Sequence, residues 1–197
     1  MENEKNLTTL KIDDELRKID ALVELALYYA RSGDVEKDFK VEPTTMQALV
    51  GAALKTYSKA IIQAGGQIRM EGLEVAVCAD SKSCAFVIGQ IISNAIKYRQ
   101  ENFCLTFTVG MEKNGVLLNI HDNGIGIDAA DLARVFDKGF TGENGRRFPK
   151  STGIGLYLCK RLCSKMNMDI AIKSQKGQGT TVVLYFPTES LLKGAGV

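Results

Sequence analysis

Two adjacent segments in which apolar residues alternate with polar ones set the strongest constraint on the fold. They span residues 104–112 and 116–122, and the Lys113-Asn114-Gly115 step lies between them. Alternation with a period of two predicts a strand with one buried face, and an Asn-Gly step favours a tight hairpin turn. The two segments are therefore expected to form a pair of antiparallel strands.

The rest of the chain supplies helices and further strands around this hairpin. Pro43 suits the first turn of a helix over residues 44–64, and Asp80 or Ser81 suits the N-cap of a second helix. Apolar periodicity and glycine turns predict the remaining elements: a strand over 74–78, helices over 129–136 and 153–166, and strands over 169–174 and 180–186. Helices mixed with hairpins predict an α+β protein built as a two-layer α/β sandwich.

An apolar seam precedes this domain. Its residues recur at alternating steps of four and three, the spacing of a coiled-coil-like helix: Ile12, Leu16, Ile19, Val23, Ala26 and Ala30. So much apolar surface needs a partner helix, from this chain or from a second copy of it. The pattern stops at Ser32-Gly33-Asp34 and a charged connector follows. The expected divisions are an N-terminal segment over 1–40, a domain over 41–190 and a tail over 191–197.

Charge and composition argue against several classes of protein. The formal net charge is +2, and Lys and Arg are scattered among acids, so nucleic-acid binding is not expected. No apolar run approaches the ~20 residues of a membrane span, and the start MENEKN has no signal-peptide core, so a cytosolic chain without membrane contact is expected. Five cysteines without a C-x-x-C pair fit reduced core thiols, and zinc is disfavoured because His121 is the only histidine.

The helix that follows Asp80 carries polar residues along one face. Gln90, Asn94, Lys97 and Tyr98 fall at positions i, i+4, i+7 and i+8, and apolar residues occupy the other side. An amide oxygen one turn from an ammonium group can coordinate Mg²⁺ while the ammonium meets phosphate oxygens. The alternative is an amphipathic helix whose polar side simply faces water.

Asp122 stands at the end of the second strand of the hairpin, in the segment NIHDNGIGI. Its ionised carboxylate accepts hydrogen bonds only, and the exocyclic amine of an adenine edge, with an adjacent water, would supply donors. Gly124 and Gly126 would let the backbone pass close to a flat ring. The alternative is an Asx turn over Asp122-Asn123-Gly124 with no ligand.

Two further glycine pairs stand near expected helix and strand starts. Gly153 and Gly155 open a helix whose free N–H groups form an anion site, with Ser151 or Thr152 as the cap. Gly177 and Gly179 precede the hydroxyl residues Thr180 and Thr181. Two ordinary turns are the alternative.

The segment DKGFTGENGRRFPKS lies between these features, over residues 137–151. Its density of glycine and charge predicts a mobile flap, with Phe140 among its apolar anchors. Its basic residues could reach a γ-phosphate when the flap closes, or they are solvated loop charges: Lys138, Arg146, Arg147 and Lys150.

Five motifs in this order resemble the nucleotide-binding boxes of sensor histidine kinases. They are Q-x-x-x-N-A-I-K-Y, D-N-G-I-G-I, F-D-K-G-F, T-G-I-G-L and G-Q-G-T-T, and the resemblance covers residues 44–187. It implies the Bergerat fold, with a mixed, mostly antiparallel sheet, which this family shares with DNA gyrase and heat-shock chaperone ATPases. Two segments are similar to the corresponding segments of Gram-positive sensors of cell-envelope stress and peptide antibiotics: FDKGFTGENGRRF and STGIGLYLCKRLCSKM.

The resemblance also implies ATP and Mg²⁺ as ligands and gives roles to matching residues. Asn94 would bind Mg²⁺, Lys97 and Tyr98 would contact phosphate and sugar, Asp122 would accept from the adenine amine, and Thr181 would close the adenine side. The remaining residues implied to line the nucleotide site are Gly124, Gly126, Ile127, Phe140, Thr152, Gly153, Gly155, Leu156 and Thr180. Gln90 stands where these kinases commonly have Asn, which leaves its metal role open.

The resemblance implies transfer of the ATP γ-phosphate to a histidine that this chain does not contain. Related hydrolases have a glutamate where Gln90 stands, and an amide cannot act as a general base, so slow or absent ATP hydrolysis is expected. The seam over residues 12–30 resembles the second helix of the dimerisation hairpin of these kinases, which implies a second copy of the chain as a partner. The family resemblance also implies a response regulator as a partner and a membrane-anchored parent protein. The alternatives are a nucleotide-regulated interaction module without catalysis and a serine kinase of the anti-sigma type.

Overall fold

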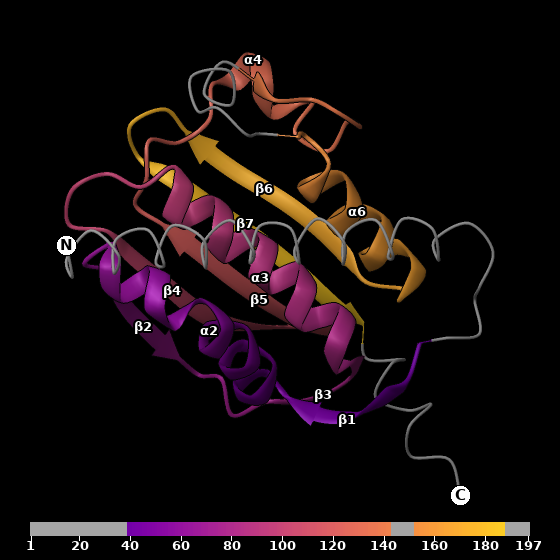
Figure 1. The fold of residues 1–197 in the computed structure, drawn as a ribbon. Helices are drawn as coiled ribbons and strands as arrows, with labels where there is room; N and C mark the ends of the chain where they lie inside the picture. Colours follow the sequence, from indigo (N-terminus) through magenta and orange to yellow (C-terminus); the bar gives the residue numbers. More distant parts are fainter. Residues whose placement is uncertain (1–38, 143–151, 188–197) are drawn as a thin grey trace, which may run out of the picture. The chain divides into compact units, whose positions relative to one another are not determined.

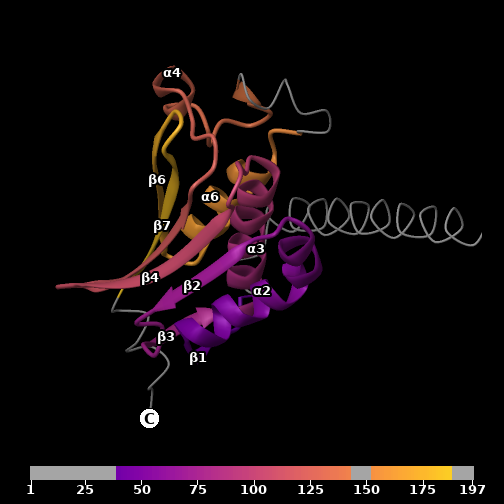
Figure 2. The same ribbon diagram turned by 90° about the vertical axis from the view of Figure 1, so that its left-hand side faces the viewer.

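The described part of the chain forms a five-stranded sheet with helices on one face. In this computed structural model the described residues are 39–142 and 152–187. The sheet has the order β2-β4-β5-β7-β6, and its strands are β2 (Gln67–Glu71), β4 (Cys104–Glu112), β5 (Gly115–Asp122), β6 (Asp169–Gln175) and β7 (Gly179–Pro187). Three helices cover one face: α2 (Met46–Gln63), α3 (Ser81–Lys97) and α6 (Gly155–Lys165) (Figures 1 and 2). The predicted two-layer α+β architecture is confirmed.

Strand pairing is antiparallel except at one edge. β4 and β5 form the predicted hairpin, β5 pairs with β7 and β7 with β6, whereas β2 runs parallel to β4. Two short strands, β1 (Val41–Thr45) and β3 (Ala76–Asp80), form a separate antiparallel ladder. A short helix, α4 (Ala129–Leu132), follows β5 and ends earlier than the sequence predicts.

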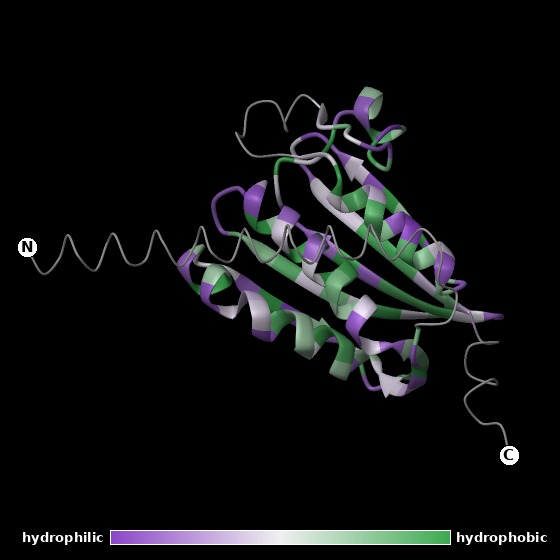
Figure 3. Cartoon of the chain, turned by 45° about the vertical axis from the view of Figure 1, so that its right-hand side comes forward, coloured by the Kyte–Doolittle hydropathy of each residue, from purple (hydrophilic) through white to green (hydrophobic). Residues whose placement is uncertain are grey.

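The core lies between the helices and the covered face of the sheet. Val87, Ile88, Ile91 and Ile92 of α3 are at most 3% exposed, so the predicted apolar side of this helix is its buried side. The alternating residues of β5 are buried as predicted, and Figure 3 shows hydrophobic residues concentrated along these two layers. All five cysteines are free thiols, and four of them are buried.

Two strands were not predicted, and one proline was assigned to the wrong element. Pro43 lies in β1 opposite Cys78, and Thr45 caps α2 by accepting from Ala48 N. The residues of β1 and β2 are almost all exposed, so neither strand has the alternating buried apolar residues that predict a strand from sequence. Pro43 is tolerated there because β1 has only one neighbouring strand.

Several sequence-based predictions lie outside the described residues. The apolar seam over 12–30, residues 143–151 of the flap segment and the tail over 191–197 are among them. Within the described ranges, no helix has the length and apolar character needed to cross a membrane.

Replacing Asp80 with alanine is expected to lower the free energy of unfolding by about 1–2 kcal/mol. Asp80 is only 7% exposed, and its carboxylate accepts from Ser83 N at 2.7 Å, which caps α3, and from Lys40 N at 2.9 Å. Alanine leaves both N–H groups without this acceptor. Urea unfolding measures the loss. Asp80→Asn is the matched control, because it keeps an acceptor oxygen, and an equal loss in both variants would contradict the capping role.

Candidate functional site

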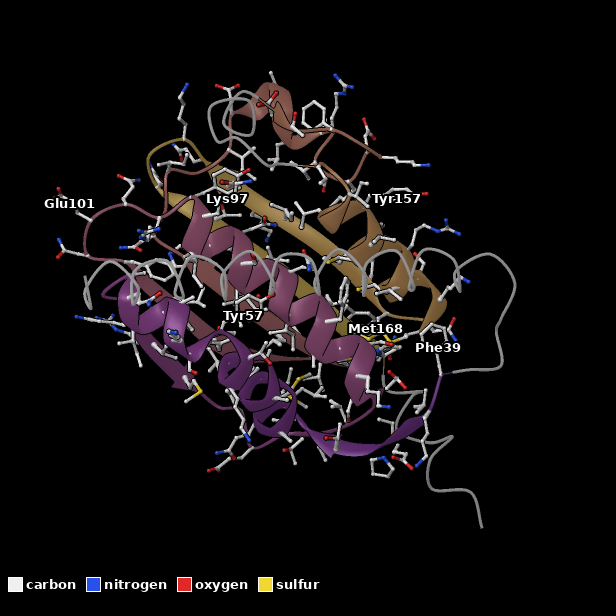
Figure 4. All side chains as sticks on the ribbon, in the orientation of Figure 1. Phe39, Tyr57, Lys97, Glu101, Tyr157 and Met168 are labelled. Atoms are coloured by element: carbon white, nitrogen blue, oxygen red, sulfur yellow. The ribbon has the colours of Figure 1, made fainter. Side chains whose placement is uncertain are left out.

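The end of α3 and the loop after β5 lie against each other. Ile125 N donates to the carbonyl of Tyr98 at 3.0 Å, and the Gln100 side chain donates to the carbonyl of Gly124 at 2.8 Å. Figure 4 places Lys97 at this end of α3. Two of the motifs that the sequence singles out, one on a helix and one after a strand, therefore meet at one end of the sheet.

The polar face of α3 leads toward this junction. Gln90, Asn94 and Lys97 are half-buried, unlike the fully buried residues on the other side of the helix. In the described ranges no group of three or more His, Cys, Asp or Glu side chains could hold a metal ion. A divalent cation would depend on amide, phosphate and water oxygens, and that donor set suits Mg²⁺, which usually keeps several waters and binds substrate phosphates.

Asp122 is a buried carboxylate on the covered face of the sheet. It is 9% exposed, and its Oδ1 accepts from Gly124 N at 2.8 Å. Burial raises the pKa of Asp122 above its ordinary value, and the N–H groups of Gly124 and Thr180 and the nearby His121 partly offset this. The Asx turn that the sequence offers as an alternative is present, so the carboxylate both shapes its own loop and stands at the junction with α3.

The glycines after Asp122 lie close to the main chain of other segments. A Cβ on Gly124 would lie 2.6 Å from the Tyr98 carbonyl oxygen, and a Cβ on Gly126 would overlap the Gln175 carbonyl oxygen. Gly126 also has φ +69°, which favours glycine. Close packing against protein backbone therefore requires glycine at both positions.

The N-cap of α6 is not the residue that the sequence predicts. α6 begins at Gly155 with Ile154 as its N-cap, which makes no side-chain capping bond. Thr152 is exposed and accepts weakly from Ile154 N at 3.4 Å, so Thr152 is not the helix cap, and Ser151 lies outside the described residues. The Gln90 amide oxygen lies 2.8 Å from where a Gly155 Cβ would stand, which brings these two predicted site residues together.

Of the two threonines that open β7, only Thr180 shares the face of Asp122. Strand register places Thr180 opposite Asp122 and Thr181 opposite His121. The Thr181 hydroxyl lies 3.0 Å from His121 Nδ1, on the face of the sheet that the helices leave open. The structure therefore places Thr181 and Asp122 on opposite faces of the sheet.

The remaining predicted residues lie in the loop after β5, in the segment that follows α4 and around the start of α6. Ile127 and Leu156 are half-buried, Gly139 N donates to the carbonyl of Gly153, and Phe140 lies under Arg134, whose Cζ is 4.5 Å from the ring centroid.

Three residues at the site make contacts that the sequence did not predict. Ser174 accepts from Ile127 N at 2.9 Å and lies 2.9 Å from the Thr180 hydroxyl, so it ties the loop after β5 to β6 and β7. Gln100 and Asn123 make side-chain bonds to neighbouring segments. Ser174 lies in the predicted strand over 169–174 and Asn123 in the Asx turn, but the contacts of all three residues are with other segments, so no local pattern predicts them.

The chain matches the family model described as "Histidine kinase-, DNA gyrase B-, and HSP90-like ATPase" over residues 79–190. Among curated proteins it is 36% identical to the sensor histidine kinase YxdK of Bacillus subtilis over 181 residues, 91% of this chain and 56% of that protein. It is 33% identical to the sensor protein BceS of Halalkalibacterium halodurans, over 89% of this chain and 52% of BceS. It therefore spans about half the length of these relatives.

Solved structures agree on the fold. Full-length ShkA in complex with AMPPNP aligns with a TM-score of 0.72 at 21% identity, over 84% of this chain and 35% of ShkA. The nucleotide-free catalytic domain of histidine kinase ThkA aligns with a TM-score of 0.65 at 18% identity, over 75% of this chain and 97% of that domain. The predicted Bergerat-type architecture is confirmed by these alignments.

Proposed function

Because this chain belongs to the family of histidine kinase-, DNA gyrase B- and HSP90-like ATPases, we propose that it is the ATP-binding catalytic part of a two-component sensor histidine kinase. It transfers the γ-phosphate of ATP to a histidine outside this chain. The observation that carries the proposal is the junction at the end of the sheet, where the buried Asp122 loop is bonded to the end of α3.

Each predicted residue has a role that its chemistry supports. Asp122 accepts from the adenine amine, Lys97 binds phosphate oxygens, and Tyr98 contacts the sugar. Asn94 holds Mg²⁺, which when bound neutralises charge on the phosphates. Thr180 replaces Thr181 beside the base, because Thr180 stands opposite Asp122 in the sheet.

The phosphate acceptor is not His121, the single histidine of the sequence. His121 is exposed and bonds to Thr181 on the open face of the sheet, whereas Asp122 points to the helix side. The apolar seam in residues 1–40 supports a dimerisation helix that pairs with a second copy. The proposal also includes a response regulator as the next phosphate acceptor. It places this chain in the cytosol, as part of a membrane-anchored parent protein.

Supplying a histidine in trans tests the transfer. The chain is incubated with labelled Mg-ATP and with the two-helix histidine hairpin of a sensor kinase similar in sequence. We expect acid-labile label on the hairpin histidine and little free phosphate, because Gln90 cannot accept a proton from water. Label on serine instead would favour a serine kinase, and binding without any transfer would favour a nucleotide-regulated interaction module.

Replacing Asn94 with alanine is expected to weaken Mg-ATP binding about tenfold and to remove its dependence on magnesium, since one metal-directed oxygen is lost. Calorimetric titration with and without Mg²⁺ measures both effects. Asn114→Ala is the matched control, because Asn114 is exposed in the β4–β5 turn. Full magnesium dependence in Asn94→Ala would exclude Asn94 as the metal-binding residue.

A further inference from the structure

Two amide side chains join the loop that carries Asp122 to the segment that leaves α3. Asn123, the residue after Asp122, contributes both ends of its amide. Its Oδ1 accepts from Cys104 N at 2.8 Å, and its Nδ2 donates to the carbonyl of Asn102 at 2.9 Å. Asn102 has φ +56°, a conformation that is uncommon for a residue other than glycine. The Asn123 amide therefore adds two hydrogen bonds to this turn, which the buried Phe103 also anchors.

Gln100 makes the second connection. Its Nε2 donates to the carbonyl of Gly124 at 2.8 Å, and the neighbouring main chain adds the bond from Ile125 N to the Tyr98 carbonyl. The lack of a Cβ on Gly124 is what permits this approach. Both residues bond to main-chain atoms, so they fix the path of the loop rather than any other side chain.

The position of the Asp122 carboxylate depends on this loop. Its Oδ1 is bonded to Gly124 N, and Gly124 is the residue whose carbonyl Gln100 holds. A shift of Gly124 would rotate the Asx turn and move the carboxylate with it. A recognition group that is held in place before binding loses less entropy on binding, so the loop contacts act on affinity.

We propose that Gln100 and Asn123 are positioning residues for adenine recognition, acting by holding the Asp122 loop on the end of α3. The inference rests on the proposed ATP-binding function. Neither side chain needs to touch the nucleotide. Their effect is specific to the exocyclic amine of adenine, because the group that they position is the carboxylate that accepts from that amine.

The test compares Gln100→Ala and Asn123→Ala with the unmodified chain, using ATP and ITP as ligands in calorimetric titrations with Mg²⁺. ITP carries an oxo group where ATP has the exocyclic amine, so this position of the base accepts hydrogen bonds and cannot donate to Asp122. We expect each variant to bind ATP about three- to tenfold more weakly and to bind ITP within twofold of the unmodified chain. Gln47→Ala is the matched control, because Gln47 is exposed on the first turn of α2.

The outcomes separate a positioning role from general support of the fold. Equal weakening of ATP and ITP would mean that these amides only stabilise the domain, and unchanged ATP affinity would mean that they do not act on the site. Gln100 is exposed, so its variant is expected to fold even where Asn123→Ala loses thermal stability. An unmodified chain that binds no ATP would overturn the proposed function itself, whereas normal ATP binding with unaffected variants would overturn only this inference.

Discussion

Replacing Asp122 with asparagine is expected to weaken Mg-ATP binding about a hundredfold, with the fold preserved. The variant loses the hydrogen bond that the adenine amine donates to a charged carboxylate. The NH2 group of the asparagine would also face the adenine amine, so that two donors meet. Asparagine keeps an oxygen that can accept from Gly124 N, so the Asx turn survives. Calorimetric titration measures the affinity, and circular dichroism checks the fold. Unchanged affinity would exclude Asp122 from nucleotide recognition.

The same Asp122→Asn variant is expected to be more stable toward unfolding, although it binds Mg-ATP more weakly. Burial raises the native pKa of Asp122 above 3.8, so ionisation costs the native state stability at pH values above that native pKa. This cost disappears as pH falls and the carboxyl becomes protonated in both states. The free energy of unfolding of Asp122→Asn should therefore exceed that of the unmodified chain at neutral pH, and the gap should shrink toward pH 3.8.

Replacing Gly126 with alanine is expected to lower the free energy of unfolding by about 3 kcal/mol, from backbone strain together with steric overlap. Gly126 has φ +69°, and an added Cβ would overlap the Gln175 carbonyl oxygen. Gly177→Ala is the matched control, because Gly177 has φ +81° but nothing within 4 Å of an added Cβ. It should lose only about 1 kcal/mol, for strain alone.

Urea unfolding of the two glycine variants measures the difference. If both variants lose the same free energy, then overlap with the β6–β7 turn contributes nothing and strain accounts for the whole effect. A loss in Gly126→Ala of more than about twice that in Gly177→Ala supports close backbone packing as the reason for this glycine.

The sequence predicted the elements whose burial is periodic. The β4–β5 hairpin and the apolar side of α3 follow from alternation with periods of two and 3.6, and Asp80 follows from the chemistry of helix caps. β1 and β2 could not be found in this way, because a strand that is exposed along most of its length has no buried face to produce a pattern.

The residue types of the candidate site could be predicted from the sequence, but the strand register that places them could not. Adjacent threonines look equivalent in the sequence, and only the pairing of β5 with β7 shows that Thr180 and not Thr181 stands beside Asp122. Gln100 and Asn123 were missed for the same reason. Their partners are main-chain atoms of segments up to 24 residues away, which no local pattern encodes.

The pairing of β5 with β7 also has a kinetic consequence. It brings Asp122 beside Thr180 across a long stretch of chain, and closing such a loop is slow because its entropy cost comes before the contacts that offset it. The candidate nucleotide site is complete only after that closure. A ligand that binds a late-forming site slows the unfolding rate and leaves the folding rate almost unchanged. The lifetime of the folded domain would then lengthen as the concentration of nucleotide rises.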